Sequence, residues 1–537
     1  MQNPPSRLYR ARAVFTLLLL ASAPCIPAFS QSAAESYRQA VLAIQQHIES
    51  GDLDGAHSLL DQAARHFPND GGLENLLGVI EIQQGHPEQA RQAFAAAVKH
   101  SPRLVSAYLN LARVDMETAS DNSKDRAEAL HAYESVLRIE PGNPEANYQA
   151  ATLLMWSQHY QLSLDHLAKL GPQDRDQVGA VGIACVDEAG LGHKAQADHA
   201  AAALAARQDL NEQVAMILLP GLRATRRADL IETIFSAVDQ REPLTAAGLR
   251  ILGLAQEAEG KLVQARATLE RCFARDPAST VALVDLARVA EESHDDRGAL
   301  GYLAHARAIN PKDASLPYRF GVICARMNLL GEARKAFEDA IKLAPKNPQY
   351  NLAMGTVAAF GHDPMEALPY FQTYHQLRPD DPVGTLALGS TYFRARDYDH
   401  AVPWLHQAAA QPRTAARALY YLGRIARDKN NLDEALRDLE QSAKLEPKEP
   451  DVLAEIGQIY VGLKRYPEAQ KELEAALALD ADNYAANFGL LQFYVRTQDA
   501  RLHAQSARFE AVKNKREQES REMMRVIEID PKGQPRH

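Results

Sequence analysis

The amino-acid sequence predicts an all-α protein that is built as a solenoid of antiparallel helix pairs. Three observations lead to this prediction: alanines, glycines and prolines each recur every 34 positions over a long block of the chain. The length points the same way, because a single hydrophobic core stops growing at roughly 250–300 residues and this chain has 537 residues. A repeat array needs no single core, since each unit packs only against its neighbours.

The period is regular from 246 to 483. Alanines keep one phase, and glycines keep another in which Ala287 is a small substitute. The two series are Ala265, Ala299, Ala333, Ala367, Ala401, Ala435 and Ala469, and Gly253, Ala287, Gly321, Gly355, Gly389, Gly423 and Gly457. Prolines close the units at Pro277, Pro311, Pro345 and Pro379, and again at Pro447. Chance does not hold three residue types to one period, so we interpret the block as seven successive repeats.

Each residue type has a physical duty within a unit. Leu249, Leu252 and Gly253 are three and four positions apart, so they share one face of a first helix. A glycine inside a helix costs about 1 kcal/mol relative to alanine, and its recurrence therefore predicts close contact with a second helix. Large side chains of that second helix are expected to fill the contact, and Pro277 ends the unit. These large residues are Leu269, Leu303, Phe337, Phe371, Leu405, Leu439 and Leu473.

This pattern resembles the tetratricopeptide repeat family. The unit of that family is a 34-residue helix–turn–helix with small residues at its eighth and twentieth positions, a large apolar residue at its twenty-fourth and a proline near its end. The N-terminal part is similar too, because Ala56 and Leu60 recur as Ala90 and Phe94. The resemblance implies a right-handed superhelical solenoid of helix pairs.

Departures from the period suggest how the chain is organised. We expect an N-terminal array of about four repeats over 31–172, with a polar insertion near 118–128, and degenerate helical repeats over 173–245. The regular array over 246–483 follows, and then a capping helix and a long charged helix over 484–537. A change of curvature within 173–245 is expected to divide the array into two lobes. For the last helix two interpretations stay open, because it either caps the solenoid or docks elsewhere.

The first thirty residues predict a secretory signal. Three arginines precede a short apolar run from Ala13 to Ala23, and small residues predict cleavage between Ser30 and Gln31. No later stretch of the sequence is long and apolar enough to predict a transmembrane helix. We therefore expect an exported protein, periplasmic or secreted, and the absence of an Asn-x-Ser/Thr acceptor favours a bacterium.

Neither composition nor motifs indicate bound cofactors or chemistry. Signal cleavage would change the formal net charge from −10 to −13, which argues against nucleic acid because phosphate binding needs clustered positive charge. The sequence has no His-Glu-x-x-His motif, no nucleophile elbow and no phosphate-binding glycine loop. We predict no catalytic site, no metal, no cofactor and no enzymatic activity. Cys185, Cys272 and Cys324 are interpreted as buried thiols, although export would permit a disulfide.

The resemblance implies that the first helices line a concave groove in which partner segments bind. Carried over by position, the groove residues are Arg250, Arg288, Tyr318, Arg326, Phe393, Arg394, Tyr420, Arg424 and Arg427. Arginine and aromatic residues are typical of interaction hot spots, so we expect protein or peptide partners, acidic or aromatic-rich. The alternative is that these residues make ordinary contacts between neighbouring units.

Taken together, these features predict a non-catalytic scaffold or adaptor that acts outside the cytoplasm. One alternative is an accessory subunit of envelope polysaccharide synthesis or export. Another is a periplasmic chaperone, whose groove would expose apolar surface rather than arginine. A third is the repeat half of an enzyme such as a glycosyltransferase or peptidase, which is disfavoured because nothing with strand periodicity follows the repeats. The sequence predicts no oligomeric state.

Overall fold

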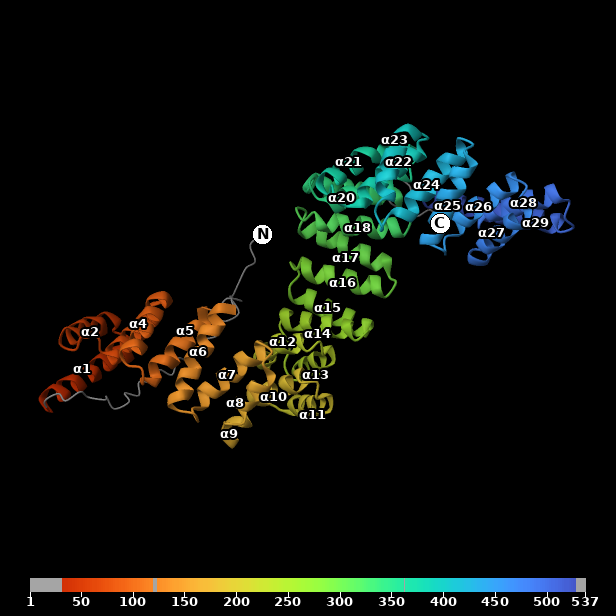
Figure 1. Cartoon of the computed structure of the whole chain (residues 1–537). Helices are drawn as coiled ribbons and strands as arrows, with labels where there is room; N and C mark the ends of the chain where they lie inside the picture. The colour runs from red at the N-terminus through yellow and green to blue at the C-terminus, as the bar shows by residue number, and fades with distance from the viewer. Residues whose placement is uncertain (1–30, 119–122, 362, 528–537) are drawn as a thin grey trace. The chain divides into compact units, whose positions relative to one another are not determined.

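The structure is a computed structural model that describes residues 31–118, 123–361 and 363–527 (Figure 1). The predicted signal over 1–30 lies outside the described residues, and so does 119–122 within the predicted insertion. The described residues form 29 α-helices and one short 3-10 helix, with no strand among them. The prediction of an all-α fold is confirmed.

The helices follow one another as the first and second members of successive pairs. Up to Arg275 they are α1 (Gln31–Ser50), α2 (Leu53–His66), α3 (Gly71–Gln84), α4 (Pro87–His100), α5 (Val105–Thr118), α6 (Ser123–Ile139), α7 (Pro144–Trp156), α8 (Tyr160–Leu167), α9 (Pro172–Arg175), α10 (Val178–Gly190), α11 (Lys194–Ala206), α12 (Glu212–Ala224), α13 (Ala228–Asp239), α14 (Ala246–Ala258) and α15 (Leu262–Arg275).

The series continues in the same way toward the C-terminus. These helices are α16 (Thr280–Glu292), α17 (Asp296–Ile309), α18 (Ser315–Arg326), α19 (Leu330–Leu343), α20 (Pro348–Ala359), the 3-10 helix η1 (Pro364–Ala367), α21 (Leu368–Leu377), α22 (Pro382–Arg394), α23 (Tyr398–Ala409), α24 (Ala415–Asp428), α25 (Leu432–Leu445), α26 (Pro450–Gly462), α27 (Tyr466–Leu479), α28 (Tyr484–Thr497) and α29 (Leu502–Ile527).

A residue with left-handed backbone geometry follows the first helix of most of the described pairs at a fixed place. In three successive pairs it is Gly260 at φ 71°, His294 at φ 58° and Asn328 at φ 62°. Non-glycine residues adopt this region uncommonly. Its recurrence at one position therefore shows that the fold imposes the same tight turn between the two helices of these pairs.

The recurrent glycines lie where the two helices of a pair touch. A Cβ added to Gly321 would meet the ring of Phe337 at 2.6 Å, and one added to Gly423 would meet Leu439 Cγ at 2.7 Å. Equivalent clashes would arise at Gly253, Gly355, Gly389 and Gly457. The prediction of a close glycine contact, filled by a large side chain of the second helix, is confirmed.

A buried asparagine ties the turn between successive pairs to the next first helix. The side-chain amide of Asn351 donates to the carbonyls of Pro345, at 3.0 Å, and Asn347, at 2.9 Å. Asn147 and Asn487 make the same two bonds in their own pairs. The buried side-chain amide thus finds acceptors in the turn, and it fixes the turn to the first helix that follows.

The period also runs through 173–245, where the sequence alone is hard to follow. This region holds the pairs α10–α11 and α12–α13, with the left-handed turn residues Gly192 and Arg226 in step with the pairs that follow. On α12 a close glycine contact faces the preceding first helix α10 and not the second helix of its own pair, since a Cβ on Gly221 would meet Val186 Cγ1 at 2.6 Å. The degenerate composition therefore hides a regular backbone.

The chain divides into two compact units, one that ends at Arg275 and one that begins at Asp276. This division lies between α15 and α16, within the block that the sequence presents as a single regular array. The expected change of curvature within 173–245 stays a prediction.

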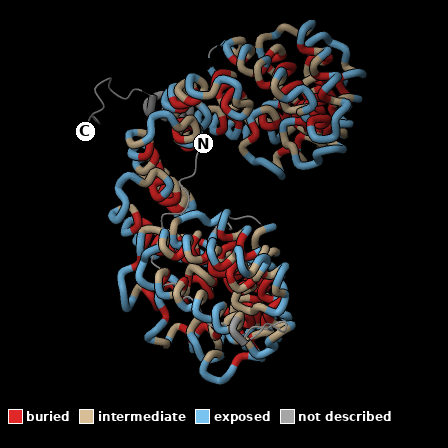
Figure 2. The backbone as a smooth tube through the Cα atoms, turned by 90° about the vertical axis from the view of Figure 1, so that its left-hand side faces the viewer, coloured by how far each residue is buried: buried red, intermediate tan, exposed pale blue. Residues whose placement is uncertain are grey.

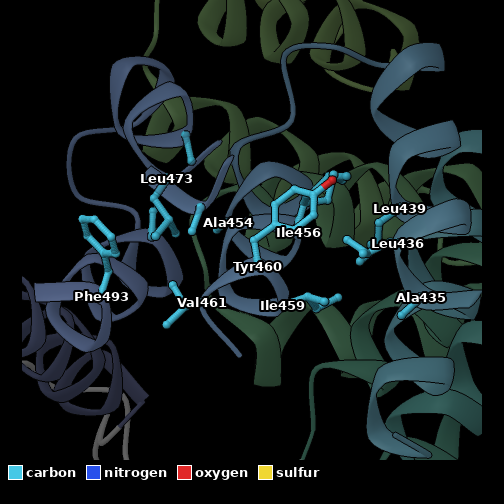
Figure 3. Packing of buried hydrophobic residues seen from close by; sticks show 14 of the residues in the cluster. Ala435, Leu436, Leu439, Ala454, Ile456, Ile459, Tyr460, Val461, Leu473 and Phe493 are labelled. Atoms are coloured by element: carbon cyan, nitrogen blue, oxygen red, sulfur yellow. The ribbon is translucent and has the colours of Figure 1, made fainter. Parts of the chain in front are cut away.

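Each pair buries the sides on which its helices meet and leaves its outer sides exposed (Figure 2). In the C-terminal unit one apolar cluster runs from α24 to α28 and includes Leu439, Ile459, Leu473 and Phe493 (Figure 3). All four side chains are buried. Because α26 packs against both α24–α25 and α27–α28, removal of one pair would expose the apolar side of the next.

The N-terminal part of α29 covers α28. Phe509 is buried, and its ring centroid lies 5.1 Å from that of Tyr484 and 5.5 Å from that of Phe488. At the edge of this contact Arg508 and Lys515 both bond to Asp482, each at 2.5 Å. This part of α29 therefore shields the last first helix, as the capping interpretation expects.

Candidate functional site

The nine predicted groove residues all lie on first helices. Arg250 is on α14, in the unit that ends at Arg275. The other eight are in the second unit: Arg288 on α16, Tyr318 and Arg326 on α18, Phe393 and Arg394 on α22, and Tyr420, Arg424 and Arg427 on α24. With each pair counted from Ala246, Thr280 and every 34th residue onward, they occupy the fifth, ninth, twelfth or thirteenth position.

Helical spacing places these positions, together with the second, along one side of each first helix. In the second unit we call this side of α16, α18, α20, α22 and α24 the first-helix face. It is the surface on which the predicted residues can be compared with one another.

Arg326 is engaged within the protein. Its guanidinium bonds to Glu291 at 3.1 Å and to Asp296 at 2.5 Å, and these hydrogen bonds raise the pKa of Arg326. Arg288 likewise pairs with Asp285 of its own helix at 3.1 Å. Arg326 thus joins neighbouring units, as the alternative interpretation of the groove residues expects, whereas the ion pair of Arg288 lies within one helix.

Arg424 lies between two aromatic rings. Its guanidinium carbon is 5.2 Å from the ring centroid of Phe393 on the preceding first helix and 5.5 Å from that of Tyr420 on its own. Nη1 donates to the hydroxyl of Tyr420 at 3.2 Å, and Nε is 3.4 Å from a carboxylate oxygen of Glu455. The structure therefore brings three predicted residues, Phe393, Tyr420 and Arg424, into one contact.

Glu455 on α26 is the carboxylate that faces the arginines of α24. It pairs with Arg427 as well as with Arg424, and its side chain is only 9% exposed. Arg427 also bonds to Asp428 at 3.2 Å. Glu455 of the next repeat thus pairs with two arginines of α24, which the sequence analysis did not foresee.

Arg394 differs from these arginines. It is exposed, and in the described part of the chain it has no carboxylate within ion-pair distance. Its guanidinium carbon lies 5.4 Å from the ring centroid of Phe360, at the end of α20. Phe360 is 63% exposed, so one face of the pair is open to solvent.

Tyr318 belongs to an aromatic contact between repeats rather than to this pair. Its ring centroid is 4.8 Å from that of Tyr350 and 5.9 Å from that of Phe337. Because Phe337 also fills the Gly321 contact, Tyr318 packs partly on the core of its own pair.

Sequence reasoning missed two residues of the first-helix face. Phe360 stands at the thirteenth position of its pair, and Arg417 stands at the second position of α24. Arg417 is exposed, and among the described residues it has no ion-pair partner. Reading every first helix at all five positions, including the second, would have found both residues.

Ion pairs join successive repeats of the N-terminal unit too. Arg113 donates two hydrogen bonds of 2.7 and 2.6 Å to the carboxylate of Glu145, and Arg91 donates one of 2.7 Å to Asp115. Burial raises the pKa of Asp115. These cations are committed to neighbouring helices, so they offer little charge to a partner.

A pocket of about 510 Å³ opens beside α17, α18 and α19. Arg307 donates to Asp339 at 3.0 Å across it, and its guanidinium carbon lies 5.3 Å from the ring centroid of Phe320. Lys342 is 3.4 Å from the same aspartate. Three of the charges that line the pocket, Arg307, Asp339 and Lys342, are therefore paired with one another, and the Asp313 carboxylate accepts hydrogen bonds from Ser315.

Other chemical features of the described residues are few. The described parts of the chain contain no group of three or more histidine, cysteine, aspartate and glutamate residues placed to hold a metal ion. Cys185, Cys272 and Cys324 are free and buried, and burial raises the pKa of Cys185 to about 12. None of the described helices combines the length and apolar character that a bilayer crossing requires.

Comparison with family models gives consistent matches. Models described as tetratricopeptide repeat match residues 47–114, 123–181, 316–347, 386–450 and 426–487. No curated protein matches the chain.

Solved structures similar to this one include the APC/C hetero-tetramer Cut9-Hcn1, at 15% identity over 86% of this chain and 97% of that chain, with a TM-score of 0.36. Yeast Tom70 is 17% identical over 89% of this chain and 92% of its own, with a TM-score of 0.37. PilF of Pseudomonas aeruginosa is 22% identical over 38% and 92%, with a TM-score of 0.31.

Proposed function

The chain belongs to the tetratricopeptide repeat family, and from that premise we propose a non-catalytic scaffold outside the cytoplasm that holds a partner segment on its first-helix face. The observation that carries the proposal is the run of aromatic and arginine side chains contributed by three successive first helices. They are Phe360 after α20, Phe393 and Arg394 on α22, and Tyr420 and Arg424 on α24. Large planar side chains and arginine supply most of the binding energy at protein interfaces.

The non-catalytic part of the proposal is supported by the architecture. Helix pairs of one kind succeed each other from α1 to α29. Such units stack into extended surfaces that suit elongated partners. We infer that the protein brings its partners close together, and that any catalysis is carried out by those partners.

The location outside the cytoplasm rests on the sequence of 1–30, with its arginines, its apolar run and the cleavage signal before Gln31. N-terminal sequencing of the protein recovered from its own host tests this part. A mature chain that starts at Gln31 is expected, and a chain that keeps Met1 in the cytoplasmic fraction would contradict export.

The acidic or aromatic-rich character of the partner is proposed from the cations of the first-helix face. Arg394 and Arg417 are exposed and have no carboxylate partner among the described residues. A guanidinium binds a carboxylate through two parallel hydrogen bonds, which gives both affinity and orientation.

Site-specific crosslinking in the full-length protein tests the proposal. A photo-reactive amino acid replaces Val322, which is 39% exposed on the first-helix face, and in a matched variant it replaces Leu445, which is 52% exposed at the end of the second helix α25. Defined partners are expected from the Val322 position and not from the Leu445 position. The same set of products from both positions would end the proposal.

The same experiment separates the alternatives. A chaperone would give many unrelated products from the Val322 position, whereas a scaffold gives few. An accessory subunit of polysaccharide synthesis or export would give products that contain a synthase or an export component.

A further inference from the structure

Four of the arginines of the first-helix face are already neutralised within the protein. Arg288 and Arg326 have carboxylate partners on or beside α16. Arg424 and Arg427 share Glu455. Arg394 stands apart, because its guanidinium faces an aromatic ring and no carboxylate of the described residues is within ion-pair distance.

The helical repeat alone does not explain why the Phe360 side chain is exposed to solvent. Among the described residues its relative exposure of 63% is the highest of any phenylalanine or tyrosine, and Tyr484 and Phe488 follow at 36%. A cation over an aromatic ring at an exposed site contributes only about 0.5–1 kcal/mol. The contact with Arg394 is therefore too weak to explain why so much apolar area stays in water.

The two residues occupy the same thirteenth position in consecutive repeats, Phe360 at the end of α20 and Arg394 at the end of α22. Phe393 precedes Arg394 in the sequence, and the ring of Phe393 in turn contacts the guanidinium of Arg424 on α24. One side of the pair is thus fixed by packed neighbours, and the other side is open. A preorganised, half-open contact of this kind needs little rearrangement to receive a ligand.

We propose that Phe360 and Arg394 form a recognition pair for a partner protein segment that carries a carboxylate next to an apolar side chain. The carboxylate accepts hydrogen bonds from the Arg394 guanidinium, and the apolar side chain covers the exposed ring of Phe360. This inference rests on the proposed function, since it names the chemistry of the segment that the first-helix face holds. Charge complementarity selects the occupant, because Arg394 is an unpaired cation on a chain of formal net charge −10.

The experiment places a photo-reactive phenylalanine analogue at position 360 of the full-length protein in its own host. The captured peptide is then sequenced by mass spectrometry. Capture of a protein is not by itself support, because the sequence of the captured segment decides. An aspartate or glutamate beside an apolar residue in a segment of another protein is expected, and capture of a second copy of this chain alone would overturn the proposal.

Substitutions of Arg394 provide the second readout. Arg394→Glu is expected to lower the affinity of the captured segment, made as a synthetic peptide, about tenfold or more, and Phe360→Ala about as much. Arg394→Lys keeps the charge and loses the two-pronged donor geometry, so an intermediate loss is expected. The matched control is Arg297→Glu, which reverses an exposed arginine on the second helix α17 and is expected to leave the affinity unchanged.

The outcomes distinguish this inference from the function on which it rests. Capture at Val322 with none at position 360, a captured segment without an acidic residue, or full affinity in Arg394→Glu would overturn the recognition pair and leave the scaffold function standing. No defined capture at either position of the first-helix face would overturn both. Because Phe360 and Arg394 are exposed, their variants are expected to unfold at the wild-type denaturant concentration, which excludes misfolding as the cause of a loss.

Discussion

Ser163 on α8 and Asp187 on α10 are both completely buried where their two helices pack together. They stand at the twentieth position of one repeat and the tenth position of the next. Most other repeats carry alanine at the twentieth position, and the tenth position is mostly an aliphatic residue such as Val289 or Ile323. The Ser163 hydroxyl donates to the carbonyl of Ala151 at 2.9 Å, and neither oxygen of Asp187 has a hydrogen-bond partner. Ser163 and Asp187 therefore place polar side chains in a contact that is otherwise mostly apolar.

Replacement of Asp187 by asparagine is expected to stabilise the protein above neutral pH. Burial raises the pKa of Asp187 to about 8, and the charge of Glu188 adds to the rise. The unfolded chain releases this proton near pH 4, whereas the folded chain keeps it until near pH 8. The folded state is therefore stabilised, relative to the unfolded state, by its tighter hold on this proton. This contribution to the free energy of unfolding is fully present below about pH 4 and is lost as the pH rises toward 8.

Each pKa unit between the two states is worth about 1.4 kcal/mol, so Asp187→Asn should raise the free energy of unfolding by roughly 1–4 kcal/mol at pH 8 and by little at pH 4. Urea titrations of both proteins at the two pH values measure this difference. Equal gains at pH 4 and pH 8 would show that ionisation of Asp187 is not the cause.

Substitution of Gly321 by alanine tests the steric role of the recurrent glycine. The added Cβ would meet the Phe337 ring at 2.6 Å, so overpacking of about 1–3 kcal/mol should outweigh the gain of about 1 kcal/mol in helix propensity. Gly301 on α17 is the matched control, because nothing lies within 4 Å of a Cβ added there. Denaturation should show loss of stability in Gly321→Ala and a small gain in Gly301→Ala. A gain in both variants would contradict the close-contact explanation.

The fold was predictable because its rules are local and repeat. The glycine at 321 and the large residue at 337 lie 16 positions apart inside one unit, and the same spacing returns six times over the regular block as a glycine or alanine and its large partner. The pair α12–α13 escaped because its alphabet is inverted. Leu219 and Ile231 stand at the eighth and twentieth positions, where the other pairs mostly carry small residues, and Gly221 makes its close contact with Val186 of α10.

The candidate site was predictable only in its position along the repeat. The predicted groove residues include several arginines, but two of them, Arg424 and Arg427, pair with Glu455 of the following repeat. Such a pairing depends on how two units stack, which no period in the sequence encodes. Phe360 escaped because its residue type does not predict that its side chain is 63% exposed.

Replacement of Arg427 by glutamine is expected to destabilise the C-terminal unit, and replacement of Arg394 is not. Loss of Arg427 leaves Glu455, 9% exposed, with Arg424 as its remaining cation. A penalty of about 1–3 kcal/mol follows from an inadequately paired, mostly buried carboxylate. Denaturant unfolding of Arg427→Gln and Arg394→Gln measures the contrast.

This contrast decides how binding experiments on the first-helix face are interpreted. Loss of binding in an Arg424 or Arg427 variant has a structural explanation, whereas loss in an Arg394 variant does not. Restoration of stability by a second substitution, Glu455→Gln, would confirm that the carboxylate is the source of the penalty. Equal stability of the two single variants would contradict the pairing.

Truncation of Phe509 to alanine tests whether α29 caps the last repeat. Phe509 is 8% exposed and packs on Tyr484 and Phe488, so its loss should destabilise the contact by about 3 kcal/mol. Because a repeat array opens from its ends, the loss should appear first as faster hydrogen exchange in α28 and then in α26–α27. Phe360→Ala removes the same side chain from an exposed site and should leave exchange unchanged. Uniform protection of α28 in Phe509→Ala would mean that α29 only lies against the array, and its role would then lie in binding elsewhere.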